Sequence, residues 1–168
     1  MGDYEIRQSA RRSSMEQKFL VVIAVSQRGQ HYFEILQRNE SINADRYIEF
    51  LTNLVNYFRT QPNPILPENM RLQHDNARPH TARATAEHIE DMNIRLLRQP
   101  PYSPDLNLCD RYIFPRLEAL RSNFNSAEDI REFLTRELPM FTVERMSQAL
   151  KAATEHMQKV IENGGKYI

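Results

Sequence analysis

Residues 18–26, KFLVVIAVS, constrain the fold more than any other segment, because they form a near-continuous apolar run rich in β-branched side chains. Such a run is typical of a strand buried on both faces, so it predicts a central strand in a sheet covered by helices. The turn QRGQ follows, in which Gly29 can adopt a positive φ, and residues 31–38, HYFEILQR, have the pattern of a second strand. We therefore expect the sheet to begin with an antiparallel hairpin.

Helical spacing first appears in residues 41–61, where Tyr47, Leu51, Leu54 and Phe58 recur at helical intervals after Asn43, the expected N-cap. The same criteria predict strands at residues 69–75 and 94–99, a helix between them at 80–93, and further helices at 110–123, 126–138 and 142–165. We expect a kink at Pro115 and a near capping-box pattern, Ser126 with Asp129, at the start of the helix at 126–138. An antiparallel pair followed by parallel strands joined by helices is an α/β fold with a mixed sheet. We expect helices to flank this sheet and C-terminal helices to complete the domain.

Composition narrows the class of protein. The chain has 168 residues, of which 40% are hydrophobic and 26% charged, and this suits one globular domain. No apolar run reaches the length of a membrane span and the N-terminus has no secretory apolar region, so we expect no membrane partner. The single cysteine, Cys109, excludes an internal disulfide. A formal net charge of zero argues against strong DNA binding by this chain alone, but it is compatible with an enzyme core that uses a separate basic module.

Five polar side chains lie close together directly after the predicted strand at residues 69–75: His74, Asp75, Asn76, Arg78 and His80. Ligand sites in α/β sheets gather at the carboxyl ends of strands, so Asp75 is expected where a functional carboxylate would lie. A solvated turn is the alternative interpretation of this segment.

Two further carboxylates, Asp105 and Asp110, lie in YSPDLNLCD at residues 102–110. The 34 residues between Asp75 and Asp110 accommodate one helix, one strand and a loop that returns the second carboxylate to the first. Two carboxylates brought together stay ionised when a hard divalent cation lies between them, and such a cation suits phosphodiester chemistry. The alternative is a pair of solvated aspartates, with Asp110 only capping the helix that it opens.

These motifs resemble those of the mariner/Tc1 group of DDE/D transposases, in which HDNA-x-x-H holds the second acid and Y-S-P-D-L-x-x-x-D the third. The chain carries HDNARPH and YSPDLNLCD at the mariner-type interval, and its closing GGKYI is also similar to the family. The resemblance implies an RNase H-like fold and metal-dependent DNA cleavage and strand transfer. It also implies Mg²⁺ or Mn²⁺ as the cofactor, the DNA of transposon ends as the partner and the nucleus as the location, and it leaves a homodimer open.

By this resemblance, Asp75 and Asp110 are the catalytic acids and the metal ligands. Asp105 belongs instead to a structural loop with Ser103 and Pro104. The residue types fit a structural loop, because Pro104 stiffens it and Asp105 can accept hydrogen bonds from its backbone amides in an Asx-type turn.

The polar neighbours His74, Asn76, Arg78 and His80 are expected to support these acids or to contact DNA, with Arg78 binding a phosphate. Zinc bound by the two histidines is the alternative, although no further His or Cys has a recognisable ligand spacing. Asn76 orients a metal-bound water or only ends the strand, and Arg78 is equally well explained as a solvated turn residue. Cys109 is expected to be a small buried filler.

The chain departs from the family pattern at the first acid. In the family, this acid ends a strand upstream of the hairpin. Asp3, in GDYE, imitates that acid, but it lies only 72 positions before Asp75, which is fewer than the intervening elements need. We therefore expect residues 1–17 to be an N-terminal tail, and residues 18–168 to be a catalytic domain that lacks the first acidic strand and the DNA-reading helix-turn-helix modules. Such a truncated copy would bind metal weakly and would be inactive or weakly active.

Two functions of other classes stay open at this stage. One is a non-catalytic module that binds nucleic acid or a partner and retains the RNase H-like fold. The other is an unrelated metal hydrolase.

Overall fold

The structure of the protein is a computed structural model that describes residues 19–36, 40–120 and 124–165. Asp3, the predicted tail at residues 1–17 and the closing residues 166–168 lie outside the described residues. The elements, in chain order, are β1 Leu20–Val25, β2 His31–Leu36, α1 Ala44–Arg59, η1 Pro67–Asn69, β3 Arg71–Gln73, α2 Arg78–Thr81, α3 Arg83–Asp91, β4 Arg95–Leu97, η2 Pro104–Leu106, η3 Cys109–Ile113, α4 Phe114–Leu120, α5 Ala127–Glu137, η4 Leu138–Met140 and α6 Val143–Glu162.

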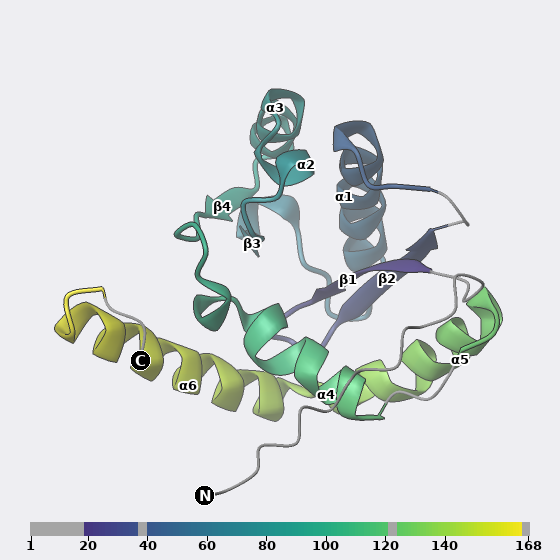
Figure 1. Ribbon diagram of the computed structural model, residues 1–168. Helices are drawn as coiled ribbons and strands as arrows, with labels where there is room; N and C mark the ends of the chain where they lie inside the picture. The colour runs from purple at the N-terminus through teal and green to yellow at the C-terminus, as the bar shows by residue number, and fades with distance from the viewer. Residues whose placement is uncertain (1–18, 37–39, 121–123, 166–168) are drawn as a thin grey trace, which may run out of the picture.

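The elements form three layers (Figure 1). Helices α1, α2 and α3 lie on one side of the strands, and α4, α5 and α6 lie on the other. Among the described residues the strands form two pairs, antiparallel β1–β2 and parallel β3–β4. Both kinds of pairing that the sequence predicts are therefore present.

The β1–β2 hairpin separates two hydrophobic cores, because its side chains alternate between its faces. Pairing runs in register from Leu20 opposite Leu36 to Val25 opposite His31. Val22, Ala24 and Tyr32 pack against the core under α1. The hairpin side chains that point to the opposite face pack against the second core. Those residues are Val21, Ile23, Val25, Phe33 and Ile35.

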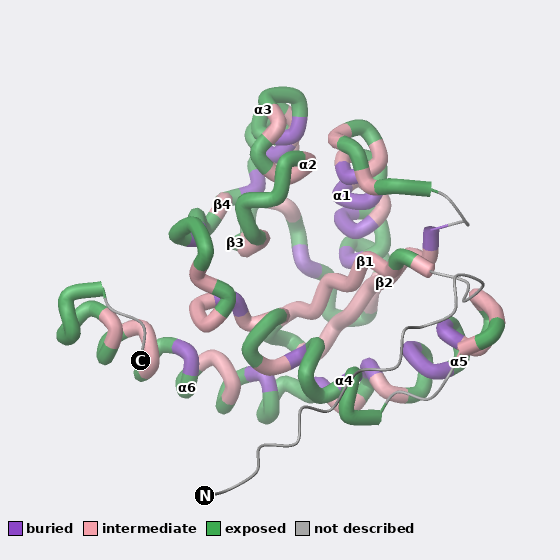
Figure 2. Tube along the Cα trace, viewed as in Figure 1, coloured by how far each residue is buried: buried purple, intermediate pink, exposed green. Residues whose placement is uncertain are grey.

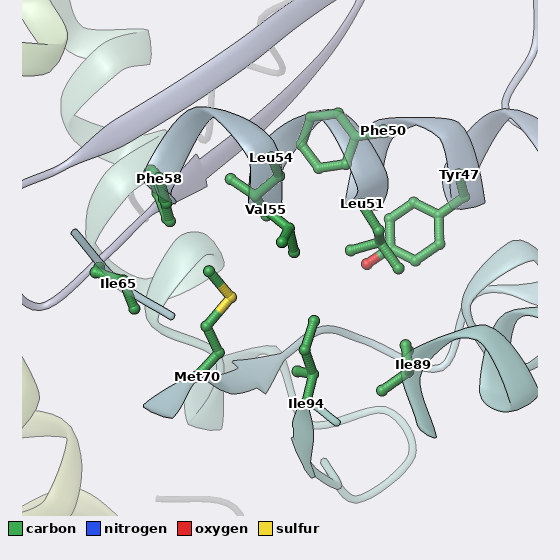
Figure 3. Close-up of a cluster of buried hydrophobic side chains, with 10 residues drawn as sticks. All are labelled: Tyr47, Phe50, Leu51, Leu54, Val55, Phe58, Ile65, Met70, Ile89 and Ile94. Carbon is green, nitrogen blue, oxygen red and sulfur yellow. The ribbon is translucent and has the colours of Figure 1, made fainter. Parts of the chain in front are cut away.

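Helix α1 organises the first core (Figure 3). Its N-cap is Asn43, as predicted, because the Asn43 Oδ1 accepts a hydrogen bond of 2.8 Å from the Arg46 backbone N–H. The apolar stripe of α1 faces side chains from β3, β4, α3 and the loop before η1. The buried members of this core are Tyr47, Phe50, Leu51, Leu54, Val55, Phe58, Ile65, Met70, Ile89 and Ile94.

The second core joins the other face of the hairpin to the C-terminal helices. Ser126 and Asp129 form the predicted capping box at the start of α5, and Thr142 caps α6. Leu138, Phe141 and Met146 are fully buried here. The last buried residue of α6 is Ala153, and the turns that follow are exposed or intermediate (Figure 2).

Three details differ from the sequence predictions. Strand β1 is half-buried rather than buried on both faces, and among the described residues it is paired along one edge only. The helix predicted at residues 80–93 is divided at Ala82 into α2 and α3. The kink expected at Pro115 is replaced by a π-helical turn, η3, in which the Phe114 N–H donates to the Cys109 carbonyl. Pro115 has no N–H with which to continue the ordinary helical pattern at this point.

Candidate active site

Asp75 lies two residues beyond β3, on the connection to α2. Its Oδ1 accepts a hydrogen bond of 3.0 Å from the Ala77 backbone N–H and lies 2.7 Å from His80 Nδ1. The Asp75 side chain is 53% exposed, so these bonds orient the carboxylate without removing it from solvent. A carboxylate held in this way is available to a ligand from outside.

Two stacked imidazoles support this carboxylate from within the domain. The rings of His74 and His80 are nearly parallel, with centroids 4.7 Å apart, and the Tyr47 ring lies 4.2 Å from that of His80. Burial and, to a smaller extent, the neighbouring His80 lower the pKa of His74 to about 4, against the opposing effect of Asp75. His74 is therefore neutral at neutral pH.

Tyr47 completes the support from α1. Its hydroxyl lies 2.8 Å from His74 Nδ1, and burial raises the Tyr47 pKa far above its ordinary value. The hydroxyl therefore stays protonated and can donate to His74. Sequence analysis identified Tyr47 only as a core residue, because nothing in the helical pattern of α1 reveals a contact 27 residues away.

Asp110 lies in the first turn of η3 and is exposed. Burial of part of the group raises its pKa above the ordinary value, and the negative charge of Asp75 raises it further. The charge of Asp75 therefore acts on the carboxyl group of Asp110. Burial raises the pKa of the adjacent Cys109 thiol to about 11, again with a contribution from Asp110, so this cysteine is an unreactive thiol at neutral pH.

Two side-chain hydrogen bonds join the segments that carry the two acids. Gln73, the last residue of β3, donates from Nε2 to the Leu106 carbonyl at 2.9 Å. Asn76 donates from Nδ2 to the Gln99 carbonyl, also at 2.9 Å. Asn76 therefore ties the end of the strand to the loop that leads to Asp110. Sequence analysis missed Gln73, which no motif singles out.

In the loop before Asp110, η2 begins at Pro104 and the Ser103 hydroxyl donates to the Pro101 carbonyl. Asp105 makes a contact outside this loop. Its Oδ2 lies 2.8 Å from His156 Nε2 on α6, and both side chains are nearly buried. The Asx-type bond is made instead by Asn107, which accepts from the Cys109 N–H at 2.9 Å.

The donor set suits a hard cation more than zinc. No group of three His, Cys, Asp or Glu residues that could hold a metal ion occurs in the described part of the chain. The carboxylates of Asp75 and Asp110 are the oxygen ligands that Mg²⁺ and Mn²⁺ prefer. Arg78 is exposed at the start of α2 and forms no ion pair with another described residue, so its guanidinium is available to an anion.

The family can now be stated. A family model described as DDE superfamily endonuclease matches residues 3–134, which include both Asp75 and Asp110. The chain belongs to this superfamily.

Within it, the chain resembles the catalytic domains of mariner-type transposases. It is 30% identical over 168 residues to the mariner Mos1 transposase of Drosophila mauritiana, covering 95% of this chain and 48% of that protein. The crystal structure of the Mos1 catalytic domain superimposes with a TM-score of 0.81 at 29% identity, covering 90% of this chain and 76% of that one. The Mos1 paired end complex with Mn superimposes with a TM-score of 0.85 at 27% identity, covering 99% of this chain and 51% of that one.

These likenesses confirm the RNase H-like fold and the resemblance to mariner-type transposases. The chain spans about half the length of the Mos1 transposase. No helix of the described residues is long and apolar enough to cross a membrane.

Proposed function

We propose that this chain is a metal-dependent DNA-cleaving domain in which Asp75 and Asp110 together bind Mg²⁺ or Mn²⁺. The observation that carries the proposal is the coupling of the two acids. They lie on segments bonded to each other through Gln73 and Asn76, and the charge of Asp75 raises the pKa of Asp110. Related Mos1 complexes are named as containing Mn or Mg, which supports the same choice of ion here.

The bound ion would activate a water or a 3′-hydroxyl and stabilise the leaving oxygen of a phosphodiester. The chain's own residues hold the carboxylates in place for this role. His80 and the Ala77 N–H orient Asp75, and the neutral His74 stacks on His80. Arg78 offers an exposed cation to a phosphate of the DNA.

The substrate and setting follow from the same family. We propose that the DNA is that of transposon ends, that strand transfer follows cleavage, and that the protein works in the nucleus, where such DNA lies. A homodimer that pairs two ends is part of this proposal, and structures named as Mos1 paired end complexes support it by similarity.

We propose further that the rate is low when only these two acids bind the ion. A divalent cation that loses water ligands needs anionic oxygens to replace them, and two carboxylates hold it less tightly than three. Each tenfold loss of rate corresponds to about 1.4 kcal/mol of barrier, so a missing ligand readily costs several orders of magnitude. Asp3 is the early carboxylate to examine as a third ligand.

Incubation of the purified protein with supercoiled plasmid and Mn²⁺ tests this function. We expect slow nicking that Asp75→Asn and Asp110→Asn each abolish, while Asp91→Asn, an exposed aspartate at the end of α3, leaves it unchanged. Nicking that persists in both site variants would refute the proposal. Fast nicking that both variants abolish would refute only the low rate, and Asp3 would then be mutated next.

A non-catalytic nucleic-acid-binding module is the second candidate. It is favoured by the lack of a third metal-ligating side chain beside Asp75 and Asp110 among the described residues. This alternative predicts DNA binding that is equal with and without Mn²⁺, and no nicking by the parent protein.

A further inference from the structure

We propose that Tyr102 is a stacking platform for an unpaired base of the DNA, held at the edge of the site. The inference rests on the proposed function in one respect, that the ligand is DNA. Tyr102 is fully exposed, at 101%, whereas the next most exposed large apolar side chain among the described residues is Ile161, at 69%. Its aromatic faces are therefore free to receive another ring.

The backbone holds this ring away from the protein in an unfavourable conformation. Tyr102 has φ of 54°, in the left-handed region that side chains with a Cβ avoid. Asn93 is the other non-glycine residue with positive φ in the described chain, and asparagine tolerates this conformation much better than tyrosine. A strained residue persists only where its surroundings impose the strain, and such residues concentrate at functional sites.

Hydrogen bonds on both sides of Tyr102 supply that constraint. The Ser103 hydroxyl donates to the Pro101 carbonyl at 3.1 Å, across the tyrosine. The buried Gln99 donates from Nε2 to the Ser103 carbonyl at 2.8 Å. Little conformational freedom of the turn is left to be lost when a base stacks on the ring.

The same bonds connect the platform to the candidate active site. Asn76, which follows Asp75, donates to the Gln99 carbonyl. The chain from Tyr102 then continues through η2 to Asp110. The exposed ring therefore lies on the loop between β4 and η2 that leads to Asp110.

The charge of the segment that carries Tyr102 fits a polyanion. Residues 92–104 contain Arg95 and Arg98 but no Asp or Glu, although the net charge of the whole chain is zero. Both arginines are exposed, as is Arg78 near Asn76, and none of the three forms an ion pair within the described part of the chain. Glu90 and Asp91, at the end of α3, are the nearest acids in the sequence before this segment.

An unpaired base fits this combination better than duplex DNA does. Aromatic side chains stack on bases of single strands, while neighbouring arginines bind the phosphates. The bases of a duplex are stacked on each other, so their faces are open only at ends or unpaired positions. We therefore expect Tyr102 to favour single-stranded over double-stranded DNA.

Fluorescence anisotropy with a labelled oligothymidylate and a labelled duplex, in EDTA, tests the proposal. For Tyr102→Ala we expect about a tenfold loss of affinity for the single strand and about a twofold loss or less for the duplex, as removal of one stacking partner predicts. Tyr102→Phe should retain the parent affinity, because it keeps the ring. The matched control is Leu97→Ala, which truncates an exposed apolar side chain on β4 and should leave both affinities unchanged.

Tyr102→Gly separates the base contact from the backbone. Glycine accepts positive φ without strain, so this variant should unfold at a higher temperature than Tyr102→Ala while binding the single strand equally weakly. Parent-like binding by Tyr102→Ala, or an equal loss with Leu97→Ala, would overturn the proposal, as would a protein partner whose capture requires Tyr102 while DNA binding does not. Because these measurements contain no metal, they remain decisive whether or not Asp75 and Asp110 cleave DNA.

Discussion

Replacement of Gly29 by alanine tests how the hairpin is fixed to the rest of the domain. Gly29 lies in the β1–β2 turn with φ of 72°, and a Cβ there would lie 3.1 Å from the Phe141 carbonyl oxygen and 3.2 Å from the Val143 backbone nitrogen. The left-handed conformation costs a residue with a Cβ about 1–2 kcal/mol. Crowding against two backbone atoms adds about 1–3 kcal/mol, because neither is the flexible end of a side chain. We expect Gly29→Ala to lower the free energy of unfolding by about 2–5 kcal/mol.

Gly164→Ala is the matched control, since Gly164 has φ of 67° but a Cβ there would meet nothing within 4 Å. It should cost only the conformational part, about 1–2 kcal/mol. Urea denaturation followed by circular dichroism measures both variants, and the slope shows whether the unfolding reactions are comparable. Equal destabilisation of the two variants, within about 0.5 kcal/mol, would refute the close approach of the hairpin turn to the start of α6.

Two further predictions concern His156 and His74. His156→Ala leaves the nearly buried Asp105 carboxylate without its partner, so it should lower the free energy of unfolding, measured in urea, by about 1–3 kcal/mol. Glu155→Ala, at an exposed position on the same helix, should change it by less than about 0.5 kcal/mol. A smaller effect of His156→Ala than of Glu155→Ala would contradict the stabilising contact between His156 and Asp105. Burial lowers the pKa of His74 from 6.5 to about 4, so between these pH values His74 is protonated in the unfolded chain but neutral in the folded one. The contribution of neutral His74 to the free energy of unfolding is fully present above pH 6.5 and is lost as the pH falls toward 4. His74→Gln should therefore make the free energy of unfolding, measured in urea, depend less on pH across this range. A pH dependence that is the same in the parent and in His74→Gln would show that His74 is not buried in its neutral form.

Local signals in the sequence predicted most of the secondary structure. The cap at Asn43, the capping box of Ser126 with Asp129 and the β1–β2 hairpin depend on neighbouring residues, and all three are present. The RNase H-like fold was expected from the resemblance of two motifs to those of the mariner/Tc1 family, not from local patterns. The burial of β1 was overestimated, because an apolar run does not reveal how many strands pair with it.

The supporting contacts of the site were not predictable in the same way. Gln73 binds a carbonyl 33 residues away and Asp105 meets a histidine 51 residues away, so neither contact leaves a local pattern. The metal-binding and catalytic roles of Asp75 and Asp110 stay predictions. They are supported by the hydrogen bonds of Gln73 and Asn76, which join the segments that carry the two acids.

Titration calorimetry with Mn²⁺ tests the central claim most directly, because it measures whether Asp75 and Asp110 bind one ion together. We expect weak, saturable binding by the parent protein, since two carboxylates replace few of the ion's water ligands. Asp75→Asn and Asp110→Asn should each abolish it, and Asp91→Asn should bind as the parent does. An Mn²⁺ affinity that is the same in the parent and in Asp75→Asn would contradict the account.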